Sequence, residues 1–275
     1  MKIILLTGGT GFVGSQILKI LQKSDFRIRL VIREGTKAKV INMKGIESVI
    51  TTPNLFSEST TWWKTACEGV ELVIHSAWYA EPGKYLQSEK NIECLIGTLN
   101  LAKGAATAGV KKFVGIGSCF EYDLSYGTLS TLTPLKPETL YSSAKVACFY
   151  TLNTFFSSQK ISFAWCRLFY LFGEGEDSRR FVPYLHKKLS KGEVAELTSG
   201  EQIRDYLDIK EAAKLIVTAA LGDKNGAINI CSGIPQTIKS IALTIAAQYG
   251  RPDLLKFGAR EDNLVDPPII IGSTH

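Results

Sequence analysis

A glycine-rich loop between an apolar run and an amphipathic helix constrains this chain more than any other feature. Residues 7–14 read TGGTGFVG and directly follow the apolar run IILL, and the glycines at 8, 11 and 14 have the spacing G-x-x-G-x-x-G. The next segment, 12–24, carries apolar side chains at helical spacing. The pattern therefore predicts a buried strand, a tight turn and a helix, which together begin a βαβ unit.

Each of the three glycines has a physical reason to lack a side chain. Gly8 permits a tight turn, Gly11 lets the backbone approach a pyrophosphate, and Gly14 lets the helix pack closely on the strand. The helix N-terminus offers unpaired N–H groups and the positive end of its dipole. The loop thus predicts a dinucleotide site. The residues expected to contact the cofactor there are Gly8, Thr10, Gly11, Phe12, Val13 and Gly14, with Ala77 at the end of the fourth predicted strand.

Short apolar strands alternate with helices over the first part of the chain. We expect strands at 2–7, 27–33, 46–51, 70–77, 111–118 and 161–169, and helices at 12–24, 57–69, 84–109 and 142–159. This alternation is typical of βαβ units, which give a parallel sheet with helices on both faces. The fold class predicted is α/β, a Rossmann-type doubly wound parallel sheet formed by residues 1–169.

The pattern changes after about residue 170. Helices near 181–191, 209–221 and 237–249 alternate with brief strands near 194–198, 205–209 and 227–231. We expect residues 170–275 to form a smaller C-terminal α/β lobe that binds the substrate, with 205–221 packing back on the first sheet. The tail DPPIIIGSTH carries adjacent prolines and is expected to be extended.

Composition and length exclude several other classes. A chain of 275 residues can form one large domain with a lobe, and its net charge of +6 includes no dense Lys/Arg run. A basic cleft for a phosphate-bearing small molecule is expected, with no nucleic-acid partner. The six cysteines form no C-x-x-C pair, which favours a reduced chain. With no signal-peptide pattern and no span of about 18 apolar residues, we expect a cytoplasmic protein without a membrane or metal partner.

The end of the second predicted strand bears on which dinucleotide binds. An acidic residue there would favour NAD, but the chain has Arg33, with Lys37 close behind. A guanidinium fork suits a 2′-phosphate, so NADP(H) is favoured, while Glu34 leaves NAD(H) open. Asn54 follows the third strand, where it either reaches the adenine amino group or is a simple loop residue.

A tyrosine and a lysine four residues apart form the predicted catalytic pair. Tyr141 and Lys145 lie at the start of a helix and face the same way. Free tyrosine, with a pKa of about 10, is a poor acid or base at neutral pH. A nearby ammonium and the positive nicotinamide ring would lower that pKa, and Lys145 could also hold the nicotinamide ribose. Ser118, at the carboxyl end of the fifth strand, can hydrogen-bond a substrate oxygen.

These residues resemble the extended short-chain dehydrogenase/reductase family, the group of nucleotide-sugar epimerases, dehydratases and reductases. The segments 91–118, 166–177 and 203–216 also resemble that family, although Glu174 stands where it usually has proline. The resemblance implies hydride exchange between nicotinamide and a sugar carbon, usually carbon-4, with Tyr141 exchanging the proton and Ser118 holding the oxygen.

The resemblance also suggests how the substrate is held. Arg180 and Arg204 match positions that grip the nucleotide diphosphate, for which guanidinium forks are well suited. The partner implied is therefore a nucleotide-diphosphate sugar. A homodimer through the predicted helices at 84–109 and 142–159 is what the family suggests.

The residues after Ser118 narrow the reaction. In the family's 4,6-dehydratases an Asp-Glu pair stands at the positions of Cys119 and Phe120, which cannot do that acid–base work. Cys119 is expected to line the substrate site, either as a small packed residue or as a base of the kind that a 3- or 5-epimerase needs. Arg33 then favours a reductase that consumes NADPH. Tyr170 stands where many members place a substrate-binding Asn.

The function predicted is an NADPH-dependent reductase of a nucleotide-linked 4-keto-6-deoxy sugar, with Tyr141 as proton donor. An NAD-dependent nucleotide-sugar 4-epimerase is the first alternative. A non-catalytic NADP-binding sensor or interaction protein is the second, and a reductase of aromatic ketones the third. The presence of Ser118, Tyr141 and Lys145 together argues against the sensor, and Arg180 and Arg204 argue against a neutral ketone substrate.

Overall fold

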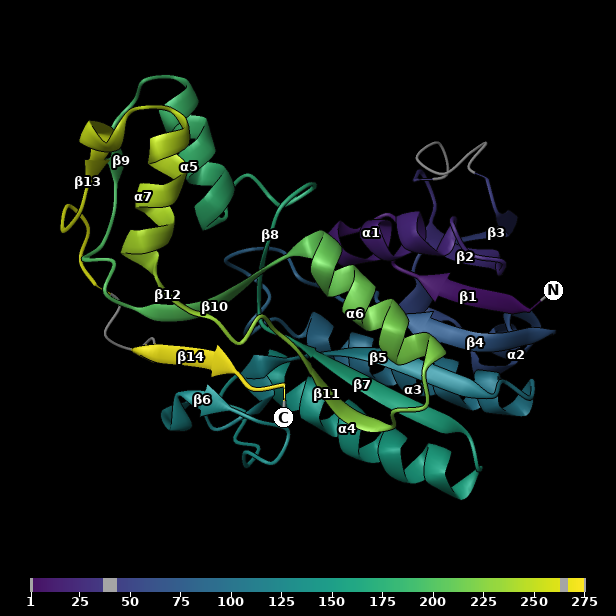
Figure 1. Cartoon of the computed structure of the whole chain (residues 1–275). Coiled ribbons are helices and arrows are strands. Elements are labelled where there is room, and N and C mark those ends of the chain that lie inside the picture. Colours follow the sequence, from purple (N-terminus) through teal and green to yellow (C-terminus); the bar gives the residue numbers. More distant parts are fainter. Residues whose placement is uncertain (1, 37–43, 263–266, 275) are drawn as a thin grey trace.

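The main sheet contains seven parallel strands in the computed structural model, which describes residues 2–36, 44–262 and 267–274. The strand order is β11-β7-β5-β4-β1-β2-β3 (Figure 1). This order confirms the predicted Rossmann-type sheet. The bounds of its strands are β1 (Ile3–Thr7), β2 (Arg27–Arg33), β3 (Ile46–Thr52), β4 (Val70–His75), β5 (Lys112–Ser118), β7 (Ser162–Leu168) and β11 (Gly226–Ile230).

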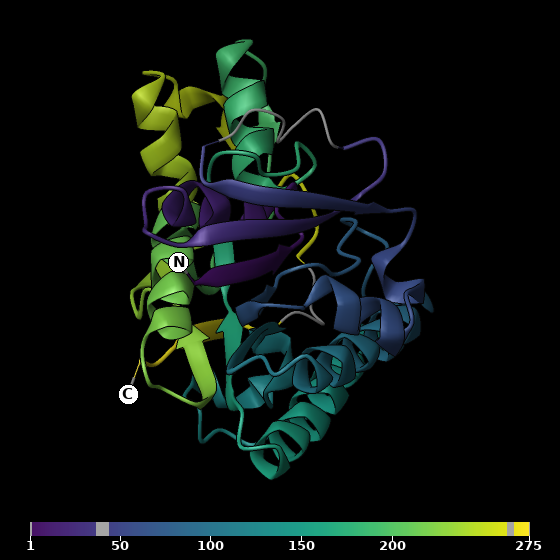
Figure 2. The ribbon, with the colours of Figure 1, turned by 90° about the vertical axis from the view of Figure 1, so that its right-hand side faces the viewer.

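Helices cover both faces of this sheet because successive strand residues point to opposite sides. Ile4 and Leu6 of β1 belong to a core with α1 and α6, whereas Leu5 between them belongs to a second core with α2, α3 and α4. Figure 2 shows the sheet with the α3 and α4 helices on one side and α1 and α6 on the other. The bounds of these helices are α1 (Phe12–Leu21), α2 (Thr60–Ala66), α3 (Lys90–Thr107), α4 (Leu140–Ser158) and α6 (Ile209–Leu221).

A second, smaller sheet connects the main sheet to the lobe. Its order is β12-β10-β14-β6, and β8 pairs with one end of β10. The lobe itself packs α5 against α7 around an apolar core of its own, at the upper left of Figure 1. The bounds are β6 (Thr128–Leu129), β8 (Tyr170–Phe172), α5 (Phe181–Ser190), β9 (Ala195–Glu196), β10 (Ile203–Asp208), β12 (Pro235–Thr237), α7 (Ile238–Gln248), β13 (Leu255–Lys256) and β14 (Ile269–Gly272).

Two segments of the C-terminal part are built into the two sheets. The strand expected near 227–231 is β11, which pairs with β7 at the edge of the main sheet and does not belong to the lobe. It does so because Ile230 is buried in the same core as Ile4 and Ile216. The extended tail contains β14, whose Ile270 is fully buried.

The parallel arrangement brings the carboxyl ends of β1, β2, β4 and β5 to one edge of the sheet, where ligands of open α/β sheets bind. Gly8, Arg33, Ser76 and Ser118 stand at or directly after these ends. The short strand β8 follows β7 almost directly and pairs with β10, so the lobe begins at this same edge.

Three structural findings concern disulfide bonds, membrane spans and metal sites. All six cysteines are free and buried. Among the described residues, no helix is long and apolar enough to cross a membrane. Within the same part of the chain, no group of three His, Cys, Asp or Glu side chains is placed to hold a metal ion.

Candidate active site

The glycine loop lies between β1 and α1 with a geometry that only glycine tolerates easily. Gly8 has φ +71°, and a Cβ on it would lie 2.7 Å from the amide nitrogen of Ala77. A Cβ on Gly14 would lie 2.1 Å from the carbonyl oxygen of Gly8, so any side chain there would push α1 off the loop. Gly8 and Gly14 thus meet the turn and packing requirements expected of them, whereas the role of Gly11 in admitting a pyrophosphate stays a prediction.

The start of α1 is free to bind an anion. Its N-cap is Gly11, which has no side chain to satisfy the first N–H groups of the helix. Backbone N–H groups at a helix N-terminus are a general binding site for phosphate. The bare cradle and the uncapped helix end together fit a dinucleotide pyrophosphate.

The residues expected to choose the cofactor lie at the ends of β2 and β3. Arg33 is the exposed last residue of β2. Lys37 lies outside the described residues. Asn54 has a local role, since its side-chain oxygen accepts a hydrogen bond from the Phe56 N–H at 3.1 Å and caps a short 3₁₀ turn. Contact of Arg33 and Asn54 with a cofactor therefore stays a prediction.

Tyr141 and Ser118 come together at the carboxyl end of β5. Thr139 caps the N-terminus of α4 by accepting from the Ser142 N–H, which places Tyr141 in the first turn. Burial raises the pKa of Tyr141, and a hydrogen bond with Ser118 opposes this rise. Without the dinucleotide, burial outweighs the hydrogen bond. The predicted lowering, which includes the charge of a bound nicotinamide ring, stays a prediction.

Lys145 is 3% exposed, and its ammonium lies against the main chain of β5 and the Trp78 ring. Its Nζ donates to the Ile116 carbonyl oxygen at 2.6 Å and lies 3.6 Å from the ring centroid of Trp78. Burial lowers the pKa of Lys145 to about 8. Lys145 therefore changes its charge not far above neutral pH. This suits a group that adjusts the proton affinity of the neighbouring Tyr141 hydroxyl.

A buried ion pair supports the backbone of Ser118, and sequence reasoning missed it. The Glu121 carboxylate accepts from the Ser118 N–H at 2.8 Å and from Arg167 Nε at 2.7 Å. Trp165 Nε1 donates to the same carboxylate, and Arg167 Nη1 donates to the Tyr122 hydroxyl. Glu121 is fully buried and Arg167 is 1% exposed. The Glu121–Arg167 ion pair thus stabilises the turn that carries Ser118, in addition to the hydrogen bonds of the sheet.

A cavity of about 400 Å³ in the lobe collects the arginines suited to a diphosphate. Arg204 lies on β10, is 3% exposed, and has its guanidinium 5.5 Å from the Tyr170 ring centroid. Arg179 and Arg260 also line this cavity, and neither was predicted. Arg260 donates to the Tyr184 hydroxyl at 3.2 Å. No motif marks Arg260, which reaches the cavity only through the fold of the lobe.

Arg180 and Cys119 lie toward the catalytic end of the site. Arg180 is the N-cap residue of α5. Burial raises the pKa of the Tyr85 hydroxyl, and the charge of Arg180, together with a hydrogen bond between the two side chains, opposes that rise. Cys119 is 3% exposed in a small apolar cluster with Tyr122, and burial raises its pKa to about 12. A thiol in this state is a poor base at neutral pH, so the packing interpretation fits, and substrate contact by Cys119 stays a prediction.

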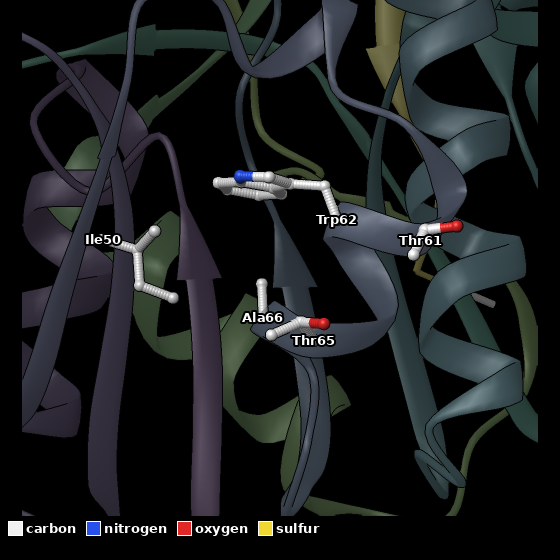
Figure 3. A pocket seen from close by; sticks show the side chains of 5 residues that line it. All are labelled: Ile50, Thr61, Trp62, Thr65 and Ala66. Atoms are coloured by element: carbon white, nitrogen blue, oxygen red, sulfur yellow. The ribbon is translucent and has the colours of Figure 1, made fainter.

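A second cavity, of about 420 Å³, lies on the flank of the main sheet (Figure 3). It is lined by Ile50 of β3 and by α2 residues, with the Trp62 ring above Ala66. Its lining includes no charged side chain, so it offers nothing to a diphosphate. The lobe cavity is the better candidate for substrate.

Comparison with known proteins agrees with this geometry. A family model described as the NAD dependent epimerase/dehydratase family matches residues 4–231. A dTDP-6-deoxy-L-talose 4-dehydrogenase (NAD(+)) from Aggregatibacter actinomycetemcomitans is 22% identical over 94% of this chain and 95% of its own length. A GDP-6-deoxy-D-talose 4-dehydrogenase from the same organism is 25% identical over 86% of this chain and 77% of its own length.

The fold has close counterparts among solved structures. A UDP-N-acetylglucosamine 4-epimerase from Methanobrevibacter ruminantium M1, in complex with UDP-N-acetylmuramic acid, superposes with a TM-score of 0.83. It is 23% identical, and the match covers 99% of this chain and 89% of that structure. At this identity the likeness establishes a shared fold.

Proposed function

Because the chain belongs to the NAD dependent epimerase/dehydratase family, whose members are NAD(P)-dependent oxidoreductases and epimerases, we propose that it is an NADPH-dependent reductase of a nucleotide-linked 4-keto-6-deoxy sugar. The observation that carries the proposal is the placement of Tyr141 against Ser118 and beside Lys145. This group stands at the sheet edge shared with the glycine loop. The two talose 4-dehydrogenases support the substrate class, since the reverse of a 4-dehydrogenation is reduction of a 4-keto sugar.

The residues divide the work as follows. The glycine loop and the start of α1 would hold the pyrophosphate, Arg33 the 2′-phosphate and Lys145 the ribose. The dinucleotide, when bound, supplies the hydride to carbon-4. The Ser118 hydroxyl donates a hydrogen bond to the carbonyl oxygen, and Tyr141 gives its proton to that oxygen as the alcohol forms. A raised pKa keeps Tyr141 protonated, which is the form that reduction requires.

The lobe would hold the nucleotide diphosphate. Arg204, Arg260 and Arg179 bring guanidinium groups to one cavity, beside the aromatic rings of Tyr184 and Tyr206. Guanidinium forks match phosphate oxygens, and aromatic rings stack on a base. Arg180, which interacts with Tyr85 instead, is proposed to act nearer the sugar than the sequence suggested.

Cofactor choice separates the reductase from the alternative 4-epimerase. A relative whose name specifies NAD(+) and a 4-epimerase fold neighbour favour the alternative, whereas Arg33 favours NADPH. We expect NADPH to bind at least about tenfold more tightly than NADH, because charge-assisted hydrogen bonds contribute about 1.5–3 kcal/mol. Fluorescence titration of the nucleotide-free chain measures this. Tighter NADH binding, or NAD retained through purification, would favour the epimerase.

A homodimer is proposed through α3 and α4. Ile92 and Ile96 of α3 are 46% and 53% exposed, and Tyr150 of α4 is 57% exposed. The two helices also pack on each other, so these side chains lie on neighbouring surfaces. Sedimentation analysis should give twice the chain mass of 30.2 kDa, and Ile96→Glu should return the monomer.

A further inference from the structure

Two aromatic rings enclose the ring of Tyr141. Tyr85 meets it edge-on at 4.8 Å between centroids and 89° between planes, and Trp78 meets it at 6.4 Å and 81°. Both come from the segment between β4 and α3, where Ala77 is the one residue that the sequence predicted to contact the cofactor. Trp78 and Tyr85 are called the aromatic bracket below. Edge-to-face pairs of this kind restrict how a ring can tilt.

Trp78 also contacts the second catalytic side chain. Lys145 Nζ lies 3.6 Å from the centroid of the indole ring, and it donates a hydrogen bond to the Ile116 carbonyl oxygen. A cation over an aromatic face is attracted most strongly where both groups are shielded from water. Lys145 is 3% exposed, so the indole face and the carbonyl together determine where the ammonium points.

One buried amide ties the bracket together. Asn91, in the first turn of α3, is fully buried. Its Oδ1 accepts from Trp78 Nε1 at 2.9 Å, and its Nδ2 donates to the carbonyl oxygens of Tyr85 at 2.6 Å and Ser88 at 2.8 Å. Leucine in its place would fill similar space and would leave the indole N–H without its acceptor.

The bracket is connected to the catalytic helix by backbone as well. The Tyr141 N–H donates to the Leu86 carbonyl oxygen at 2.9 Å, and the Leu140 N–H donates to Gln87 Oε1 at 3.2 Å. These bonds use two N–H groups of the first turn of α4. The segment and the helix are therefore directly connected, so a change in the bracket would be passed on to Tyr141.

We propose that Trp78, Tyr85 and Asn91 are positioning residues of this site: Asn91 fixes the bracket, and the bracket fixes the tilt of Tyr141 and the direction of the Lys145 ammonium. This inference rests on the catalytic roles proposed above for Tyr141 and Lys145. It assigns a function to a segment that the motifs leave unexplained. Ring packing alone would predict that any apolar side chain of similar size serves as well.

The test compares Trp78→Leu, Trp78→Phe and Asn91→Leu, with Trp62→Leu as a control on the distant flank cavity. NMR titration of the Lys145 side chain needs no substrate. In Trp78→Leu the pKa of Lys145, about 8 in the parent chain, should rise, because water reaching the buried ammonium outweighs the loss of the indole face. Trp78→Phe keeps a ring face and should stay near the parent value.

Turnover gives the second readout. We expect kcat to fall by about tenfold or more in Trp78→Leu and Asn91→Leu, with Trp78→Phe intermediate and Trp62→Leu unchanged. Folding of each variant is checked by its unfolding midpoint. If Trp78→Leu does not fold, Asn91→Leu still tests the proposal, because it keeps both aromatic rings. A parent-like kcat and a parent-like Lys145 pKa in both Trp78→Leu and Asn91→Leu would overturn the proposed role of the bracket. Full turnover in Tyr141→Phe would instead overturn the proposed function.

Discussion

Replacing Glu121 by glutamine removes one charge from a fully buried pair directly beneath Ser118. One carboxylate oxygen accepts from the Ser118 N–H and from Trp165 Nε1, and the other accepts from Arg167 Nε and again from Trp165. All of these partners are donors. A glutamine amide must therefore turn its NH₂ group toward a donor in either orientation.

The cost follows from burial. Arg167 is 1% exposed, and one of its terminal nitrogens, Nη2, already has no hydrogen-bond partner. Removing one member of a buried pair costs about 3–5 kcal/mol, because the other charge is left uncompensated. The whole free energy of unfolding of a domain is about 5–15 kcal/mol. Glu121→Gln should therefore lower the urea midpoint strongly while the chain still folds at low temperature.

Activity should fall separately from stability. If the amide oxygen stays on the charged Arg167, the NH₂ group faces the Ser118 N–H and the backbone there shifts. A displacement of about 1 Å at a reacting group can cost about 100-fold in rate. The double variant Glu121→Leu/Arg167→Met removes both charges and should recover most of the stability, but it leaves the Ser118 N–H without an acceptor, so turnover stays low.

A surface pair provides the matched control. Glu71 meets Lys2 at 3.2 Å with side chains 43% and 65% exposed, so Glu71→Gln should change the free energy of unfolding by less than about 1 kcal/mol. Urea unfolding of the four proteins, with kcat under folding conditions, measures both effects. A loss below about 1 kcal/mol in Glu121→Gln, or recovery of turnover in the double variant, would refute the reasoning.

Three further outcomes are expected. Gly14→Ala should weaken dinucleotide binding more than about tenfold in calorimetric titration, because its Cβ would lie 2.1 Å from the Gly8 carbonyl oxygen; parent-like affinity would contradict this. Burial lowers the pKa of Lys145 to about 8, so its ammonium exists below that pH and is lost above it, and kcat/KM for reduction should fall as pH rises through about 8. A flat profile up to about pH 10 would argue against this role for Lys145. The Asp205 carboxylate accepts from the N–H groups of Ser232, Gly233 and Gly272, so Asp205→Asn should cost about 3 kcal/mol in urea unfolding, and an unchanged midpoint would exclude it as an anchor.

Local patterns in the sequence were sufficient for much of this structure. The alternation of apolar strands and helices predicts the doubly wound sheet, since each element carries its own period. The glycine loop predicts its own conformation, because the positive φ of Gly8 and the contact at Gly14 are local requirements. Ser118 lies at the edge where the parallel strands end, and Tyr141 reaches it from the first turn of α4.

The features that were missed depend on contacts between distant segments. Glu121 and Arg167 are 46 residues apart and meet because β5 and β7 are neighbours in the sheet. Arg260 reaches the lobe cavity from near the C-terminus with no motif around it. The raised pKa of Tyr141 has the same origin, since burial by the segment before α3 cannot be read from a Y-x-x-x-K spacing.

Turnover of defined substrates tests the central claim most directly. The chain would be incubated with NADPH and a panel of CDP-, GDP-, dTDP- and UDP-linked 4-keto-6-deoxy sugars, with product identification and with Tyr141→Phe in parallel. The account predicts NADPH oxidation in equal amount to a product that carries a hydroxyl at carbon-4, and almost none with Tyr141→Phe. Interconversion of carbon-4 epimers of nucleotide hexoses by a chain with retained NAD, without net NADPH oxidation, would contradict it.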